Sequence, residues 1–307
     1  MVTQVVEISE DGCYLSKSRG FMIVKRDQDT LGRVPLDDIT SLVLTAHQIT
    51  LTKTLMTSLA ERGTPIVASG ANYHPLALTL PYGNHYDHSG ILWAQIEAGL
   101  PLQKRLWQSV VREKIRNQRI ILEYFAPTSS VLRELDVLVK RVKSGDPQNM
   151  EAQAARYYWS ALFGPDFRRD RETGIENMLL NYGYTVLRAA TARAVCGAGL
   201  TPALGIHHRN RKNAFALVDD IMEPFRPLVD KAVRRIVSQD GGRSDPALTV
   251  EDKRRLSKIL DTDVRSKKGI STLMNALHRL ALTLVSSLHE KENKLEFPHI
   301  LPSGSLL

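Results

Sequence analysis

The sequence predicts an α+β protein in which a small, mostly-β and sandwich-like N-terminal domain precedes a larger all-α C-terminal domain. Short runs of β-forming residues follow one another up to about residue 86, and beyond it apolar residues recur with a helical period. The change coincides with a polar stretch, HYDHSG, at 85–90. We therefore expect an N-terminal domain at 1–86, a linker at 87–100, a C-terminal domain at 101–296 and a flexible tail at 297–307.

The N-terminal domain is expected to contain short strands separated by Gly, Asp and Asn. One helix, 53–62, interrupts them and ends at Gly63, because glycine readily takes the left-handed conformation that follows many helices. The strand after this helix has the apolar composition of a buried strand. The expected strands are 2–8, 13–16, 20–25, 33–35, 41–44, 65–68 and 76–79.

The C-terminal domain is expected to be helical throughout, because each of its segments repeats apolar residues at helical spacing. Gly241 and Gly242, with polar neighbours, indicate a loop between helices rather than a third domain. The tail contains two prolines and the run Ser-Gly-Ser, which is typical of a frayed terminus. The expected helices are 101–125, 129–143, 149–163, 174–197, 217–238, 249–260 and 270–289.

Composition limits the classes of protein that this chain can be. Its 307 residues suffice for two domains, and its net charge of +8 attracts polyanions such as nucleic acid. Cys13 and Cys196 lie far apart and form no CxxC pair, which argues against a disulfide framework or a zinc-thiolate site. We find no signal sequence and no uncharged segment of transmembrane length, so we expect a cytoplasmic protein without a membrane partner.

Several common catalytic classes lack their sequence signatures here. The chain contains no GxGxxG, GxxxxGK[ST], HExxH or GxSxG motif. Dinucleotide binding, nucleoside triphosphate binding, zinc-protease chemistry and serine-hydrolase chemistry are therefore not expected.

The candidate chemical groups are carboxylates and imidazoles in the helical domain. Glu151 opens an alanine-rich helix, His207 and His208 follow a helix end, and Asp220 and Glu223 share one helix face. This donor set favours Mg²⁺ or Mn²⁺ over zinc and suits phosphodiester chemistry. Each group also has a structural interpretation. Glu151 would complement the helix dipole, the histidines would be solvated, and Arg226 would pair with Glu223.

Three groups of basic residues are candidates for contact with nucleic-acid phosphates. The helix around 104–119 carries six Lys and Arg residues against one Glu, although a solvated helix face is an equally good interpretation. A second group follows the histidines, and a third, at 253–268, is diluted by acidic residues. The candidate phosphate-binding residues are Arg112, Arg116, Arg119, Arg209, Arg211 and Lys212.

Four blocks in this order resemble a known family, the CRISPR-associated integrase and endonuclease of spacer acquisition, in the form that accompanies type II systems. The resemblance covers nearly the whole chain. The blocks are EAQAARYYW at 151–159, LNYGYTVLR at 180–188, LGIHH at 204–208 and DIMEPFRPLVD at 220–230.

The resemblance implies which residues form the site. The metal ligands of the family are a Glu, a His and an acidic residue, which by motif position correspond to Glu151, His208 and Glu223. Asp220 matches an acidic position that some members also use. The Gly-x-x-His pattern of the family selects His208, with His207 as the alternative.

The resemblance also implies an activity and partners. The N-terminal domain would form a homodimer, and two dimers would assemble around a dimer of a small CRISPR-associated partner as a heterohexamer. With Mg²⁺ or Mn²⁺, the enzyme would join the 3′-hydroxyl ends of a short foreign double-stranded DNA to the CRISPR repeat. In type II systems the effector nuclease, and in some cases a ring-shaped accessory protein, assist.

Two other functions fit the same residues. One is a non-catalytic basic scaffold that holds nucleic acid while Glu151, His208 and Glu223 serve structural roles. The other is a stand-alone endonuclease that repairs branched DNA. Acidic residues at both matching positions favour catalysis, because like charges are costly to gather without a cation.

Overall fold

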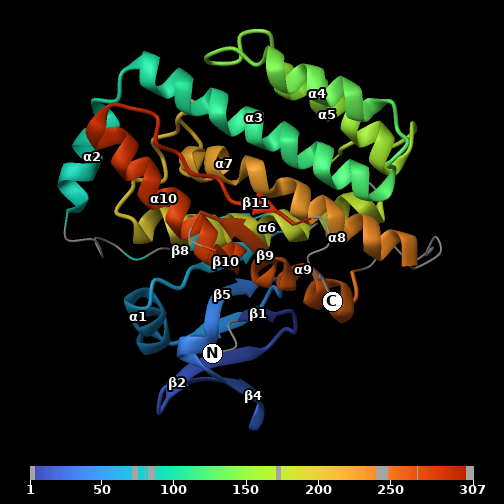
Figure 1. Cartoon of the computed structure of the whole chain (residues 1–307). Coiled ribbons are helices and arrows are strands. Elements are labelled where there is room, and N and C mark those ends of the chain that lie inside the picture. Colours follow the sequence, from blue (N-terminus) through green and yellow to red (C-terminus); the bar gives the residue numbers. More distant parts are fainter. Residues whose placement is uncertain are drawn as a thin grey trace.

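The computed structural model describes residues 4–70, 75–79, 81, 87–170, 174–239, 248–267 and 269–301. A β-rich N-terminal region is followed by a helical region, which lies above it in Figure 1. This confirms the predicted fold class. The expectations for residues 2–3, for Gly241 and Gly242 and for 302–307 lie outside the described residues. Within the described ranges, no helix combines the length and apolar character needed to cross a membrane.

Two four-stranded sheets form the N-terminal region. In the first sheet, the pairs β1–β5 and β5–β7 are parallel and the pair β7–β8 is antiparallel. In the second sheet, β2, β3 and β4 form an antiparallel meander, and β6 pairs in parallel with β2. The first sheet has the order β1 (Gln4–Ile8), β5 (Ile39–Leu44), β7 (Ile66–Ser69), β8 (Pro75–Thr79). The second has the order β4 (Asp29–Pro35), β3 (Phe21–Arg26), β2 (Cys13–Ser18), β6 (Ile49–Leu51), and the 3₁₀ turn η1 (Leu36–Asp38) precedes β5.

One apolar cluster joins the two sheets, as the sandwich-like prediction requires. It contains Ile8 and Leu42 from the first sheet and Leu15 from the second. Helix α1 (Lys53–Glu61) contributes Leu55 and Leu59, and it begins where the Thr52 hydroxyl accepts the Leu55 amide. Strand β6 is an element that the sequence analysis missed, since its three residues are too few for a clear alternation.

Helix α6 forms the centre of the helical region. Its middle is buried on all sides, and it packs against α7, α8, α9 and α10. Helix α3 is the longest helix and crosses the upper part of Figure 1 next to α4 and α5. The helices are α2 (His88–Ile96), α3 (Leu100–Phe125), α4 (Val131–Arg141), α5 (Met150–Phe163), α6 (Ile175–Gly197), α7 (Ala216–Met222), α8 (Arg226–Gln239), α9 (Val250–Ser257) and α10 (Leu273–Glu290), with 3₁₀ turns η3 (Glu223–Phe225) and η4 (Lys258–Asp261).

Two expected segments differ in the structure. The proposed linker at 87–100 contains helix α2, which packs against α10. The single helix expected at 217–238 is interrupted by η3, because Pro224 and Pro227 have no amide hydrogen with which to continue the helical bonds.

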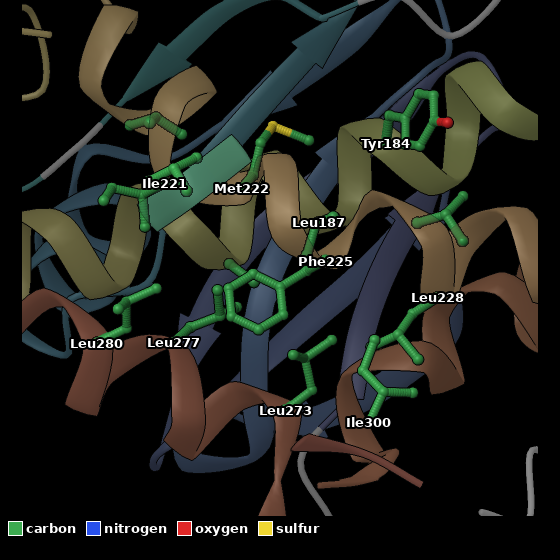
Figure 2. Close-up of a cluster of buried hydrophobic side chains, with 14 of the residues drawn as sticks. Tyr184, Leu187, Ile221, Met222, Phe225, Leu228, Leu273, Leu277, Leu280 and Ile300 are labelled. Carbon is green, nitrogen blue, oxygen red and sulfur yellow. The ribbon is translucent and has the colours of Figure 1, made fainter. Parts of the chain in front are cut away.

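The expected helix at 270–289 and the expected tail also differ. Residues Gly269–Thr272 form strand β10, which pairs with β9 (Asp263–Ser266) before α10 begins. On the other side of β9 lies β11 (His299–Ile300). Ile300 is 3% exposed and faces the helical core (Figure 2), so this part of the tail is packed rather than frayed.

The β-rich region is fixed to the helices by apolar and charged contacts. Val43 and Val67 of the first sheet pack against Ala189 of α6. The Glu7 carboxylate accepts hydrogen bonds from the Tyr182 hydroxyl over 3.0 Å and from the Lys253 ammonium over 2.6 Å. Only 12% of the Glu7 side chain is exposed, so this pair is screened little by solvent.

We expect Glu7→Gln to lower the free energy of unfolding by about 2 kcal/mol, because it removes the negative charge that pairs with the largely buried ammonium of Lys253. Urea denaturation measures the loss. Glu10→Gln is the matched control, since the Glu10 and Arg26 side chains are 60% and 45% exposed and their pairing contributes little. Equal effects of the two substitutions would contradict this account.

Candidate active site

Glu151 lies in the first turn of α5 and is held there by the residues before the helix. Asn149 adopts a left-handed conformation and accepts the Ala152 amide on its side chain. The Asp146 carboxylate accepts the amides of Met150 over 2.8 Å and of Glu151 over 3.0 Å. These bonds satisfy backbone amides that have no partner within the helix, and they fix the position of the Glu151 backbone.

Glu223 lies at the break between α7 and α8. Asn117 of α3 donates its side-chain amide to the Pro224 carbonyl over 2.8 Å. The Phe225 ring lies among Leu187, Leu273 and Leu277 in the core (Figure 2). With the backbone fixed on both sides, the Glu223 carboxylate is 8% exposed and cannot move far.

The ammonium of Lys114 lies between these two glutamates. Its Nζ donates to Oε1 of Glu151 over 2.6 Å and to Oε2 of Glu223 over 2.5 Å. Arg226 lies on the other side of Glu223, with its Nε 2.8 Å from Oε1. The interpretation that Arg226 pairs with Glu223 therefore holds, and Lys114 adds a second cation that the sequence analysis did not assign.

The electrostatics of this cluster favour the charged forms of Glu223 and Lys114. Burial acts to raise the pKa of Glu223, but Arg226 and Lys114 outweigh it and lower that pKa to about 2. Burial acts to lower the pKa of Lys114, but the carboxylates of Glu223 and Glu151 leave it above its ordinary value.

His208 is oriented by Asp220, which is completely buried. One oxygen of the Asp220 carboxylate accepts the amides of Ile206 over 2.6 Å and of His207 over 2.9 Å, and the other lies 2.5 Å from Nδ1 of His208. A Cβ at Gly205 would stand 2.9 Å from the same carboxylate, so only glycine allows this approach. The bond to Asp220 raises the pKa of His208 and leaves Nε2 as its free ring nitrogen.

His207 takes a different position. Its ring stacks on Trp107 with centroids 4.2 Å apart and planes 3° from parallel. Loss of solvent around it lowers the pKa of His207. The ring of His208 therefore contacts the Asp220 carboxylate, whereas His207 contacts it only through its backbone amide. Asp220 and Glu223 contact different partners, because Asp220 binds the His208 ring whereas Glu223 lies against Lys114 and Arg226.

The donor set matches what a hard divalent cation prefers, namely two carboxylates and one imidazole. Glu151 and Glu223 already hold a positive charge between them, and their charges reach His208 and raise its pKa. Among the described residues, no three His, Cys, Asp or Glu side chains stand in a metal-binding arrangement. In the structure the Lys114 ammonium lies between the two carboxylates.

A groove of about 620 Å³ leads to this cluster between β8 and α6. His208 and Glu223 line it, and four cationic side chains line it as well. Its basic lining suits the phosphates of a nucleic-acid strand. The four cationic residues are Arg169, Arg188, Lys212 and Arg226.

Of the six predicted phosphate-binding residues, three are engaged within the protein. Arg112 donates to the Val142 carbonyl over 2.9 Å, Arg119 pairs with Glu123 and Asp136, and Arg209 donates to Gln103 over 3.1 Å.

The other three are more accessible. Arg116 pairs with Glu113 but remains 54% exposed, and Arg211 and Lys212 are exposed in the loop after His208. The sequence analysis missed Arg169 and Arg188. Arg188 lies in one of the four blocks, but no local pattern distinguishes it from any other arginine on a helix.

Asp230 of α8 lies buried behind the cluster. It is 1% exposed and accepts a hydrogen bond from the Tyr184 hydroxyl over 2.5 Å. Burial raises the pKa of Asp230 to about 7, although Tyr184 and Arg226 act to lower it. The folded protein therefore holds a proton here at a pH at which the unfolded chain has released it.

The comparisons with known proteins agree with one another. A family model described as "CRISPR associated protein Cas1" matches residues 6–258. The CRISPR-associated endonuclease Cas1 of Neisseria meningitidis serogroup C (strain 8013) is 35% identical over 294 residues, with 95% of each chain covered. The CRISPR-associated endonuclease Cas1 1 of Francisella tularensis subsp. novicida (strain U112) is 27% identical, with 76% of this chain and 78% of the relative covered.

Solved structures share the fold. A structure described as a casposase bound to integration product matches with a TM-score of 0.83 and 19% identity, over 98% of this chain and 95% of the other. A chain of a Cas6-RT-Cas1–Cas2 complex matches with a TM-score of 0.76 and 21% identity, over 98% of this chain and 36% of the other. A CAS1 protein from Thermotoga maritima matches with a TM-score of 0.74 and 16% identity, over 95% and 99%.

We expect Asp220→Asn to lower the pKa of His208 toward its ordinary value, because the bond to the Asp220 carboxylate is what favours the imidazolium. An NMR titration of the His208 ring measures this. Asp219→Asn is the control, since Asp219 pairs with Arg188 over 2.7 Å. A His208 pKa that is the same in wild type and Asp220→Asn would show that Asp220 does not orient this ring.

Asp230 gives a second prediction. Its folded-state pKa of about 7 lies above the ordinary value of 3.8, so its contribution to stability is present at low pH and is lost as pH rises through this window. Asp230→Asn does not titrate. The variant should therefore gain stability relative to wild type by on the order of a few kcal/mol between about pH 4 and about pH 8. Parallel stability curves in urea denaturation would contradict the raised pKa.

Proposed function

The chain belongs to the Cas1 family of CRISPR-associated proteins, and we propose that it is a divalent-metal-dependent DNA endonuclease and integrase. It would insert short foreign DNA into a CRISPR array by attack of a 3′-hydroxyl on a phosphodiester. The observation that carries this proposal is that Glu223, which Lys114 joins to Glu151, lines the same basic groove as the oriented His208.

The residues have distinct roles in this reaction. Glu151, Glu223 and Nε2 of His208 would hold Mg²⁺ or Mn²⁺, which polarises a phosphodiester and lowers the pKa of an attacking hydroxyl. Asp220 fixes the His208 ring so that Nε2 faces away from its anchor. The Lys212 side chain in the groove would hold the phosphates of the strand that carries the reacting end, next to Arg188, which is paired with Asp219.

Water competes with the 3′-hydroxyl for the same position. If a DNA end is present, attack by its 3′-hydroxyl would form a new phosphodiester bond while the P–O bond of the target strand breaks and releases a 3′-hydroxyl. If water attacks instead, the same bond breaks and the strand is cut. The same residues thus serve integration and cleavage. The ratio of integration to cleavage depends on whether the bound DNA places a 3′-hydroxyl at this position.

We further propose that the protein works as a homodimer with a Cas2-like partner, two dimers around one partner dimer forming a heterohexamer. The fold shared with a chain of a Cas1–Cas2 complex supports this partner. The substrates would be double-stranded foreign DNA and the CRISPR repeat, so the reaction would occur in the cytoplasm. The sequence blocks support a type II system, in which an effector nuclease and an accessory protein would assist.

The scaffold alternative has one observation in its favour. Lys114 neutralises Glu151 and Glu223, as in a purely structural ion pair. The scaffold alternative does not explain His208, however, because the fully buried carboxylate of Asp220 orients a half-exposed imidazole. An oriented ring nitrogen is useful for ligation or proton transfer and contributes little to packing.

We expect Glu223→Gln and His208→Ala each to lower strand joining by more than about a hundredfold, since loss of even an outer partner of a ligand costs up to that much. The assay combines the protein, its partner subunit, a short duplex with 3′-hydroxyl ends and a supercoiled plasmid with a CRISPR array, in Mn²⁺ or EDTA. DNA binding should stay near the wild-type level.

Glu10→Gln, an exposed change of the same kind, is the control and should join strands normally. If the Glu223→Gln variant joined strands at the wild-type rate, Glu223 would not be part of the active site. DNA binding without joining or cleavage in Mn²⁺ would favour the scaffold, and cleavage of branched DNA without any joining would favour the repair endonuclease.

A further inference from the structure

Both carboxylate oxygens of Glu223 are already engaged by cations. Oε2 accepts a hydrogen bond from Lys114 over 2.5 Å, and Oε1 lies 2.8 Å from Nε of Arg226. A divalent cation needs to approach a carboxylate oxygen to about 2.0–2.6 Å, and it repels a second positive charge at the same oxygen. Each carboxylate oxygen retains a second lone pair, so the repulsion between cations is the main obstacle, and withdrawal of one of these two side chains would favour ligation of a metal ion by Glu223.

Lys114 is the side chain that can withdraw. Arg226 lies with its guanidinium 4.6 Å from the centre of the Tyr184 ring and is followed by Pro227, so its position is fixed on two sides. The Lys114 ammonium is a compact charge at the end of four flexible methylene groups. Its withdrawal would also release Glu151, the second carboxylate that it contacts.

A place for the withdrawn ammonium lies next to the cluster. A cavity of about 200 Å³ is lined by Lys114 and Gln118, by the carboxyl groups of Asp230 and Glu223, and also by the cationic side chains of Arg169 and Arg226. Gln118 is one helical turn beyond Lys114 on α3 and is 2% exposed. Among the described residues its buried Oε1 has no hydrogen-bond donor, which is a cost that folded proteins usually avoid.

We propose that Lys114 is a built-in counter-cation with two positions. In the metal-free protein it holds Glu151 and Glu223 together, and when a divalent cation binds, its ammonium moves into the cavity and donates to Oε1 of Gln118. Lys114 thus keeps the acidic site assembled before the metal arrives and sets how tightly the metal binds. The inference rests on the proposed metal site and makes Lys114 a positioning residue.

The test is Mn²⁺ binding by the full chain without DNA, at one fixed pH, measured by isothermal titration calorimetry. Lys114→Met keeps the length of the side chain and removes the competing charge, so Mn²⁺ should bind at least about tenfold more tightly. Lys140→Met, an exposed change of the same charge on α4, should leave the dissociation constant unchanged.

Gln118→Met removes the acceptor in the cavity and gives an independent test. It should weaken Mn²⁺ binding several-fold while Lys114 is present, and should have no effect in the Lys114→Met background. A merely structural role of either residue does not predict this dependence. Gln118→Met alone also tests the inference if the Lys114→Met protein does not fold.

Equal Mn²⁺ affinity in wild type and Lys114→Met, or equal affinity in wild type and Gln118→Met, would overturn the inference while leaving the metal site in place. Weaker binding in Lys114→Met would also overturn it, because it would make Lys114 a support for the metal rather than a competitor. Absence of Mn²⁺ binding in wild type and in every variant would instead contradict the proposed metal site itself.

Discussion

The contact between the Lys114 ammonium and two glutamates is the interaction on which the site depends. Glu151 and Glu223 come from parts of the chain 72 positions apart, and two carboxylates at low exposure would repel each other without a cation. The surrounding fold serves to bring these charges together. Helix α3 supplies Lys114 and the amide of Asn117 that holds the Pro224 carbonyl, so one rigid helix fixes both the cation and one of its partners.

The same principle, that a buried charge needs dedicated partners, explains the second half of the site. Asp220 is buried completely and is satisfied by the backbone amides of Ile206 and His207 and by the His208 ring. This arrangement turns a loop into a rigid support for one imidazole nitrogen. Asp220 and Glu223, three positions apart, therefore have different roles. Asp220 orients the His208 imidazole, whereas Glu223 contacts the Lys114 ammonium.

Local patterns in the sequence predicted the fold class and most helices, since period and turn residues are local properties. They also indicated Glu151, His208 and Glu223 as a possible donor set, although the choice of His208 and Glu223 came from the resemblance. Lys114 could not be assigned from the sequence. It lies 37 and 109 positions from its two partners, and its helix face reads equally well as solvated. The strands β9 and β10 were missed because they are four residues long and rich in charged or polar residues.

We expect Glu151, His208 and Glu223 to be ligands of one divalent cation. The most direct measurement is anomalous X-ray diffraction at the manganese absorption edge from crystals of the full chain grown with Mn²⁺. The account predicts one strong anomalous peak within bonding distance of both carboxylates and of Nε2 of His208, with the Lys114 ammonium no longer between the carboxylates. A structure with Mn²⁺ bound elsewhere and Lys114 still joining Glu151 to Glu223 would contradict it.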